Sequence, residues 1–319
     1  MLFRSIKEIM KEKKRCIITS EWELGAGKMG TGQGPKTILA YLEASHNEAF
    51  EEIPVIEVKS NEMPEENPST PHLKNGAALF EHQTTLAFNV AKQLRDGYKC
   101  ILLSADHSNG IGGVSGLAQC VPIDEIGLIW IDAHFDLHSP YTTPSGNSHG
   151  MTVNALINND NKFQSIRTLD PQTIQLWDRI KLIKGNMGIP TENLVFVDVR
   201  DFESQESHLV HENEIAWIQP AEIAEKGIEN CIDQIFNTLS HCKYLYVSFD
   251  VDCLNTDIAI ATGTPVEGGL RLDQAQKLMD ALMSDERTQC LEITEFNPAL
   301  PHPELLLPAI ETILRPLLD

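Results

Sequence analysis

The sequence predicts an α/β fold in which a mainly parallel β-sheet is covered by helices on both faces. Short apolar runs that read as buried strands alternate along the 319 residues with amphipathic stretches that read as helices. This alternation implies right-handed crossovers between parallel strands. Hydrophobic residues make up 42% of the chain and charged residues 22%, as in ordinary folded proteins. We expect a single domain over residues 1–319, because the polar segment 61–71 reads as a surface excursion and no repeat interrupts the pattern.

Apolar runs mark the strands that we expect. In chain order they cover residues 16–19, 55–58, 100–103, 127–131, 194–197, 244–249 and 290–293. Amphipathic helices are expected between them. The clearest examples cover residues 35–42, with a proline at the start, and residues 82–95, 221–239 and 273–283.

A glycine-rich loop follows the first expected strand. Gly25-Ala-Gly27-Lys-Met-Gly30 formally matches the G-x-G-x-x-G pattern of dinucleotide-binding proteins. The next helix is expected only beyond Gly34, so these glycines do not open a helix as pyrophosphate binding requires. Met29 stands where a P-loop needs serine or threonine. We interpret the loop as a structural turn, and a nicotinamide-dependent oxidoreductase rests on this pattern alone.

Charge and segment composition predict where the protein acts. A formal net charge of −21 opposes binding to nucleic acid or anionic membranes, whereas a cationic small substrate is compatible with it. The N-terminus has no apolar signal-peptide region, and no segment approaches the ~20 apolar residues of a membrane span. The seven cysteines include no C-x-x-C pair, which fits reduced thiols. We therefore expect a cytoplasmic protein with no nucleic-acid or membrane partner.

The strongest chemical signal is Asp132-Ala-His134-Phe-Asp136-Leu-His138, directly after the expected strand 127–131. In extended backbone, residues two apart point to the same side, so Asp132, His134 and Asp136 are expected to converge. Ligands of open α/β sheets bind at the carboxyl ends of the strands. This segment therefore predicts a polar site at that edge of the sheet.

Two more expected strands end in residues of the same kind. Asp250 and Asp252 follow the strand 244–249, and His107 follows the strand 100–103. Any one aspartate after a strand is equally well explained as a helix or turn cap, but packed carboxylates cannot all stay ionised without a cation. Oxygen and nitrogen ligands without cysteine favour dications such as manganese. Two ions held about 3.5–4 Å apart would generate hydroxide near neutral pH.

In their order along the chain, these residues resemble the ureohydrolase family, which includes arginase, agmatinase, guanidinobutyrase and formimidoylglutamase, and they are most similar to arginase. The resemblance spans most of the chain and rests on Ser104-Ala-Asp-His-Ser, Asp132-Ala-His-Phe-Asp, Ser248-Phe-Asp-Val-Asp, Thr262-Gly-Thr-Pro and Glu295-Phe-Asn-Pro. It implies a three-layer α/β/α fold with a central eight-stranded parallel sheet. It also implies two Mn²⁺ per subunit, or other divalent metals, and a homo-oligomer that is a trimer or hexamer.

The resemblance assigns the metal ligands residue by residue. They are two histidines and four aspartates, namely His107, Asp132, His134, Asp136, Asp250 and Asp252. Asp132 and Asp250 would bridge the two ions. His107 and Asp136 would complete one ion, and His134 and Asp252 the other.

The segment 142–150 indicates the substrate. It resembles the arginase version of this loop, in which Ser145 and Asn147 would contact the substrate carboxylate and His149 would assist proton transfer. Agmatine lacks that carboxylate, so such a loop suits an α-amino acid. Ser-Gly-Asn is also plain turn chemistry, which leaves a purely structural interpretation open. We predict the hydrolysis of L-arginine to L-ornithine and urea.

The resemblance also indicates roles in substrate binding and catalysis for five residues. Glu295, after the strand 290–293, would hold the planar guanidinium, and Thr264 and Glu203 would contact the substrate. Asp136 would orient a hydroxide that bridges the metals for attack on the guanidinium carbon, while His149 protonates the leaving amine.

Four positions depart from the arginase pattern. Glu203 stands where arginases usually place an aspartate that meets the α-amino group, Ser104-Ala105 replaces Gly-Gly, and His138 replaces the asparagine of animal arginases. These departures leave open another ureohydrolase that acts on agmatine, guanidinobutyrate, formimidoylglutamate or guanidine. A non-catalytic metal-dependent binding protein is a further alternative.

Overall fold

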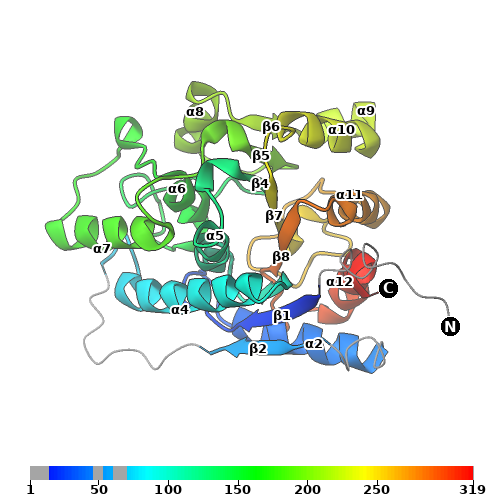
Figure 1. Ribbon diagram of the computed structural model, residues 1–319. Helices are drawn as coiled ribbons and strands as arrows, with labels where there is room; N and C mark the ends of the chain where they lie inside the picture. Colours follow the sequence, from blue (N-terminus) through cyan, green and yellow to red (C-terminus); the bar gives the residue numbers. More distant parts are fainter. Residues whose placement is uncertain (1–13, 46–52, 60–69, 319) are drawn as a thin grey trace.

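An eight-stranded, all-parallel sheet forms the centre of the computed structural model, which describes residues 14–45, 53–59 and 70–318. The strands lie in the order β2-β1-β3-β8-β7-β4-β5-β6 (Figure 1). Their bounds are β1 Arg15–Ser20, β2 Val55–Val58, β3 Lys99–Ser104, β4 Ile126–Ile131, β5 Leu194–Val197, β6 Ala216–Ile218, β7 Tyr244–Asp250 and β8 Thr288–Thr294. The predicted fold class is confirmed.

Helices form the two outer layers (Figure 1). One face of the sheet packs against α4 (Gly76–Arg95), α5 (Gly110–Ala118), α6 (Thr152–Ile157) and α8 (Ser204–Glu212). The other face packs against α2 (Gly34–Ser45), α9 (Pro220–Lys226), α10 (Ile228–Thr238), α11 (Leu272–Ser284) and α12 (Pro303–Leu318). Helix α7 (Pro171–Lys181) packs outside α4. None of the helices in the described residues is long and apolar enough to cross a membrane.

Burial on both faces explains why the strands read as continuous apolar runs. All six residues of β4 are buried, with Ile129 and Ile131 in the core under one helical layer and Leu128 and Trp130 in the core under the other. Each of the seven expected strands is present. The eighth, β6, has only three residues, of which Ala216 and Trp217 are partly buried, so the sequence showed no apolar run there.

Two expectations about the helices are refined by the structure. The prediction of one helix over 221–239 is wrong, because the chain forms two helices, α9 and α10, that meet at Gly227. Gly227 has φ +85°, a left-handed conformation that ends a helix. The residues Gly25 to Gly30 form turns, and α2 begins only at Gly34, as expected for a structural loop. Most of the expected excursion 61–71 lies outside the described residues.

The topology fixes the position of the site. Strands β3 and β4 follow each other along the chain, yet β8 and β7 lie between them in the sheet. In open α/β sheets, such a reversal of strand order opens a crevice at the carboxyl ends of the central strands. The ends of β3, β8, β7 and β4 therefore border one crevice.

Close packing of α5 on α4 gives the first prediction. A Cβ at Gly116 would lie 2.5 Å from the Cβ of Val90 and 2.8 Å from the carbonyl oxygen of Ala87. Gly116→Ala should therefore lower the free energy of unfolding by about 1–3 kcal/mol through overpacking, although alanine is the better helix former. Urea unfolding measures this change, and Lys92→Ala on the exposed side of α4 is the control. An unchanged or raised midpoint for Gly116→Ala would contradict the packing argument.

Candidate metal centre

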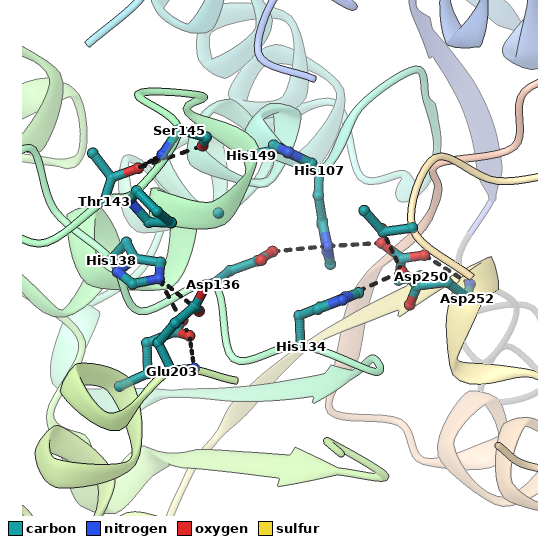
Figure 2. A pocket seen from close by; sticks show the side chains of 14 residues that line it. His107, His134, Asp136, His138, Thr143, Ser145, His149, Glu203, Asp250 and Asp252 are labelled. Carbon is teal, nitrogen blue, oxygen red and sulfur yellow. Dashed lines mark hydrogen bonds and ion pairs between the residues drawn. The ribbon is translucent and has the colours of Figure 1, made fainter. Parts of the chain in front are cut away.

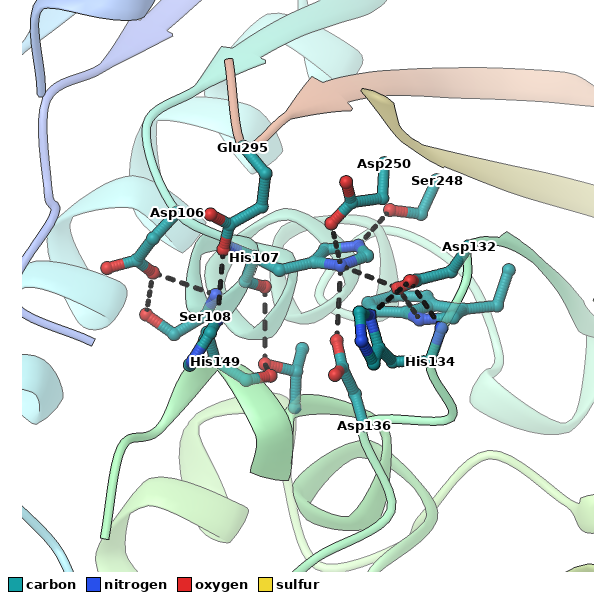
Figure 3. A network of polar contacts seen from close by, with 12 residues as sticks. Asp106, His107, Ser108, Asp132, His134, Asp136, His149, Ser248, Asp250 and Glu295 are labelled. Atoms are coloured by element: carbon teal, nitrogen blue, oxygen red, sulfur yellow. Dashed lines mark hydrogen bonds and ion pairs between the residues drawn. The ribbon is translucent and has the colours of Figure 1, made fainter. Parts of the chain in front are cut away.

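The carboxyl ends of the central strands bring the predicted ligands together (Figure 3). Asp132, His134 and Asp136 follow β4, while Asp250 is the last residue of β7. Asp252 lies in the 3₁₀ turn that follows β7, and His107 begins the 3₁₀ turn after β3.

Three carboxylates surround the imidazole of His107. Its Nδ1 lies 3.0 Å from Asp132 Oδ2, 3.1 Å from Asp136 Oδ2 and 3.2 Å from Asp250 Oδ2. All four side chains are buried. This group therefore offers one nitrogen and three oxygens around a common point.

A second group is built on His134. Its Nδ1 lies 3.4 Å from Asp132 Oδ1 and 3.2 Å from Asp252 Oδ2. Asp132 thus faces both groups, one with each carboxylate oxygen. Asp250 faces the first group through Oδ2, while its Oδ1 accepts a hydrogen bond from the backbone N–H of Asp252 at 2.8 Å. The assignment of Asp250 to the second ion stays a prediction.

The hydrogen bonds of His107 provide a test of whether a cation fits. Its Nε2 lies 2.8 Å from Ser248 Oγ, whose hydroxyl donates to Glu292 Oε2 at 3.2 Å. Nε2–H is therefore the donor of the neutral imidazole, and the lone pair of Nδ1 faces three carboxylates. Among the described residues, His107 Nδ1 and Asp136 Oδ2 are buried without a hydrogen-bond partner. Such a cluster of acceptors is what divalent cations require, so the residues fit a pair of metal ions.

The pKa shifts of His107 and Asp250 indicate the same need for positive charge. Burial lowers the pKa of His107, but the surrounding carboxylates, Asp132 first, outweigh burial and raise that pKa well above its ordinary value. Burial also raises the pKa of Asp250, and the neighbouring Asp252 and Asp132 raise it further. Without a metal, protons are the only cations that relieve the repulsion.

Backbone and indole donors fix the orientation of the carboxylates. Asp132 Oδ1 accepts from the backbone N–H of His134 at 2.7 Å, and Asp132 Oδ2 accepts from Trp130 Nε1 at 3.0 Å. Asp252 Oδ1 accepts from the backbone N–H of Ala133 at 3.2 Å. The indole of Trp130 also stacks on the His107 ring, with centroids 4.0 Å apart. The site is therefore pre-organised by the strand ends that carry it.

A pocket of about 140 Å³ opens above the two groups, which is room for a small molecule (Figure 2). On one side lie the predicted ligands His107, His134, Asp250 and Asp252. Thr143, Ser145, His138 and Glu203 face them from the other side, and Asp136 lies between the two. The remaining lining residues are Pro144, His149, Gly150, Glu206 and Thr264.

Two predicted substrate residues do not line this pocket. Asn147 lies on the same loop as Ser145, but its Oδ1 accepts from Lys74 Nζ at 3.0 Å. Glu295, with 3% of its side chain exposed, lies behind the lining residue His149. Its Oε1 is 3.1 Å from His149 Nδ1 and accepts from the backbone N–H of His107 at 2.9 Å.

Sequence reasoning gave no role to three buried acids beside the site. Glu292 accepts from the hydroxyls of Ser104 and Tyr246 as well as Ser248. Asp106 accepts from the backbone N–H groups of Gly25 and Ala26, which ties the glycine-rich loop to the site, and Glu206 accepts from that of Leu137. The sequence did contain a signal for Glu292, because a carboxylate within the apolar run 290–293 indicates a buried acid that needs hydrogen-bond donors.

Comparisons with known proteins agree with this geometry. A sequence profile of the arginase family matches residues 13–311. Over 217 residues the chain is 32% identical to "Arginase-2, mitochondrial" of Bos taurus, which covers 67% of this chain. The chain spans only 57% of the length of that relative.

Solved structures of similar shape cover nearly the whole chain. The arginase of Bacillus caldovelox has a TM-score of 0.83 and 24% identity, and covers 97% of this chain and 99% of its own. The arginase of Bacillus subtilis has a TM-score of 0.81 and 25% identity, with the same coverage of 97% and 99%. These proteins therefore share the fold of this chain.

Glu292 yields a prediction because it lies behind His107 and touches no predicted metal position. Glu292→Gln should lower the affinity for Mn²⁺ by roughly 10–100-fold. The substitution weakens the hydrogen bond that orients the Ser248 hydroxyl, and this hydroxyl in turn fixes the tautomer of His107. Calorimetric titration of Mn²⁺ into metal-free protein measures this affinity. Glu286→Gln, the same charge change at an exposed position before β8, is the control. Equal affinities of the two variants would rule out this supporting role.

Proposed function

The chain belongs to the arginase family, whose members are binuclear metal amidinohydrolases, and on this premise we propose that it hydrolyses L-arginine to L-ornithine and urea with two bound manganese ions. The observation that carries the proposal is the pair of ligand groups that share Asp132 at the base of a small-molecule pocket. Oxygen and nitrogen ligands without cysteine favour manganese among the available dications.

Each residue of the centre has a proposed share in holding the metals. His107 and Asp136 would bind one ion, His134 and Asp252 the other, and Asp132 and Asp250 both. When bound, two such ions lower the pKa of a water molecule and so provide hydroxide near neutral pH. Asp136 is proposed to orient this nucleophile, because its carboxylate lies between the two sides of the pocket (Figure 2).

Glu295 is proposed to orient the substrate. Guanidinium is a planar, permanently charged fork of donors, and a carboxylate shielded from water is a strong partner for it. Glu295 has that character, since it is buried and its Oε1 is fixed by two hydrogen bonds. A guanidinium held by this carboxylate would be placed in line for attack on its carbon.

His149 is proposed to deliver the proton to the leaving amine. Burial lowers the pKa of His149, but its hydrogen bond to Glu295 and the charge of that carboxylate outweigh burial and raise the pKa to about 9. The imidazole is therefore protonated at neutral pH and lines the pocket. A guanidinium that pairs with Glu295 would weaken the interaction of this carboxylate with His149. The pKa of His149 would then fall, and the imidazole would release its proton more easily, as a general acid must.

The rim of the pocket supports an amino acid as the substrate. Hydroxyl groups of Thr143 and Ser145 lie on one side and could donate to a carboxylate, while Glu203 and Glu206 lie near His138 and could accept from an ammonium group. Thr264 donates to Asp252 Oδ2 at 3.1 Å and is proposed to contact the substrate. Asn147 would need to release Lys74 to join them. This arrangement favours L-arginine over agmatine, which lacks the carboxylate.

Urea release tests the proposal directly. Mn²⁺-loaded protein is incubated with L-arginine, agmatine, guanidinobutyrate and guanidine, while formamide release is followed for formimidoylglutamate. We expect turnover of L-arginine above the rest. Asp132→Asn is the control, because loss of the shared carboxylate should remove both metal binding and turnover. Turnover of another compound only would overturn the choice of substrate, and no turnover of any compound by fully metallated protein would overturn the enzyme proposal.

Exchange of Glu295 tests the proton-transfer proposal. In Glu295→Gln, the pKa of His149 should fall from about 9 toward its ordinary value, because the favourable charge is gone. The ion pair stabilises the fold fully below about pH 6.5 and loses its effect as the pH rises through about 9. An NMR titration of the histidine rings in metal-free protein measures the pKa, with Glu267→Gln at an exposed position as control. The same pKa in all three proteins would refute the coupling.

A further inference from the structure

A buried imidazole joins the two loops that border the distal side of the pocket. His138 follows β4, and Glu203 follows β5 and immediately precedes α8 (Figure 2). His138 Nε2 lies 2.9 Å from Glu203 Oε2 and 3.4 Å from Glu206 Oε2. Only 7% of the His138 side chain is exposed, whereas 52% of the Glu203 side chain is exposed.

The hydrogen-bond partners of His138 define which way the bond to Glu203 runs. Both neighbours of Nε2 are carboxylate oxygens, which only accept when ionised, so Nε2 carries a proton and donates. Nδ1 lies 3.1 Å from the hydroxyl of Thr142, which can either donate or accept. The ring is thus held from both ends, and its donor points at Glu203.

Glu206 already links the two loops without help from His138. Its Oε1 accepts from the backbone N–H of Leu137 at 3.0 Å, and its Oε2 accepts from that of Glu203 at 3.1 Å. The bond from His138 to Glu203 is therefore not needed to hold the loops together. Its effect falls on the half-exposed carboxylate of Glu203, whose other close side-chain neighbour is the carboxyl group of Glu206.

We propose that His138 is a positioning residue that holds the Glu203 carboxylate over the pocket, so that the site selects substrates whose distal end carries an ammonium group. This inference rests on the proposed function for the identity of the substrate. Glu203 Oε2 receives the imidazole donor, which would leave Oε1 to accept from the ligand. A fixed acceptor loses less conformational freedom on binding than a mobile one, and this difference favours the ligand with the ammonium group.

Binding of a product and its deaminated analogue tests the inference without turnover. L-Ornithine and 5-aminopentanoate differ only in the α-amino group, and calorimetry on Mn²⁺-loaded protein gives both affinities. We expect the wild-type protein to prefer L-ornithine, and His138→Leu to reduce that preference about tenfold or more, as expected for a bond to a charged group. His138→Gln keeps a donor near the position of Nε2 and should restore much of the preference.

The matched control is a second histidine–glutamate pair. His302 Nδ1 lies 3.2 Å from Glu304 Oε1 on the exposed surface, and His302→Leu should leave the preference unchanged. Kinetics give an independent readout, since His138→Leu should raise KM for L-arginine more than KM for 5-guanidinopentanoate, which lacks the α-amino group. A positioning role predicts a change in this ratio, whereas a general loss of structure would affect both substrates alike.

The outcomes separate the inference from the proposed function. A wild-type protein without preference for L-ornithine, or a His138→Leu variant that retains it, would overturn the inference even if L-arginine is hydrolysed. If the preference exists and depends on His138 but no urea forms from L-arginine, the inference stands and the proposed reaction fails.

Discussion

Electrostatic repulsion among buried carboxylates is the constraint that the other groups of the site must compensate. Asp132, Asp136, Asp250 and Asp252 converge where little water enters, and the Nδ1 atoms of His107 and His134 lie beside these carboxylates. Removing an ion from water costs several kcal/mol even after relaxation, so these carboxylates depend on compensating charge and on fixed donors. The protein supplies the donors itself, through backbone N–H groups at the strand ends and the indole of Trp130. The compensating charge must come from bound cations or from protons.

The sheet makes this arrangement mechanically possible. Ligands at the ends of nearby parallel strands meet without long loops. The strands that carry them, β3, β7 and β4, each lie between two strands whose side chains are almost all buried. Two site residues are not placed by a strand end alone. Asp136 and Glu295 have a left-handed backbone conformation, with φ +53° and +65°. Such conformations cost about 1–3 kcal/mol in non-glycine residues and persist only where the surroundings impose them. Here they turn each carboxylate back toward the site just after its strand has ended.

The sequence predicted those features that depend on neighbours along the chain. Six of the seven predicted strands were visible because burial on both faces leaves apolar runs, whereas the edge strand β2 is apolar although mostly not buried. The ligand clusters were visible because acids spaced by two follow such runs. Contacts between residues far apart in the chain could not be predicted in this way, because no local sequence pattern marks them. Glu292 meets Ser104 across 188 positions, and only the folded sheet shows that it sits behind His107. The same holds for Asn147, whose contact with Lys74 depends on how two loops meet.

Strand β8 contributes no predicted metal ligand, yet residues on it and directly after it support His107, a proposed metal ligand, and His149, the proposed proton donor. Glu292 acts through Ser248 on His107, and Glu295 accepts from His149 as well as from the backbone of His107. Because β8 lies between β3 and β7, it is flanked by the strands that deliver His107 and Asp250. A shift of this one strand would therefore alter the surroundings of His107, the proposed metal ligand, and of His149, the proposed proton donor. Strand β8 and the residue directly after it thus form one support for both imidazoles, which explains why a strand otherwise suited to the core contains the buried Glu292 and is followed by the buried Glu295.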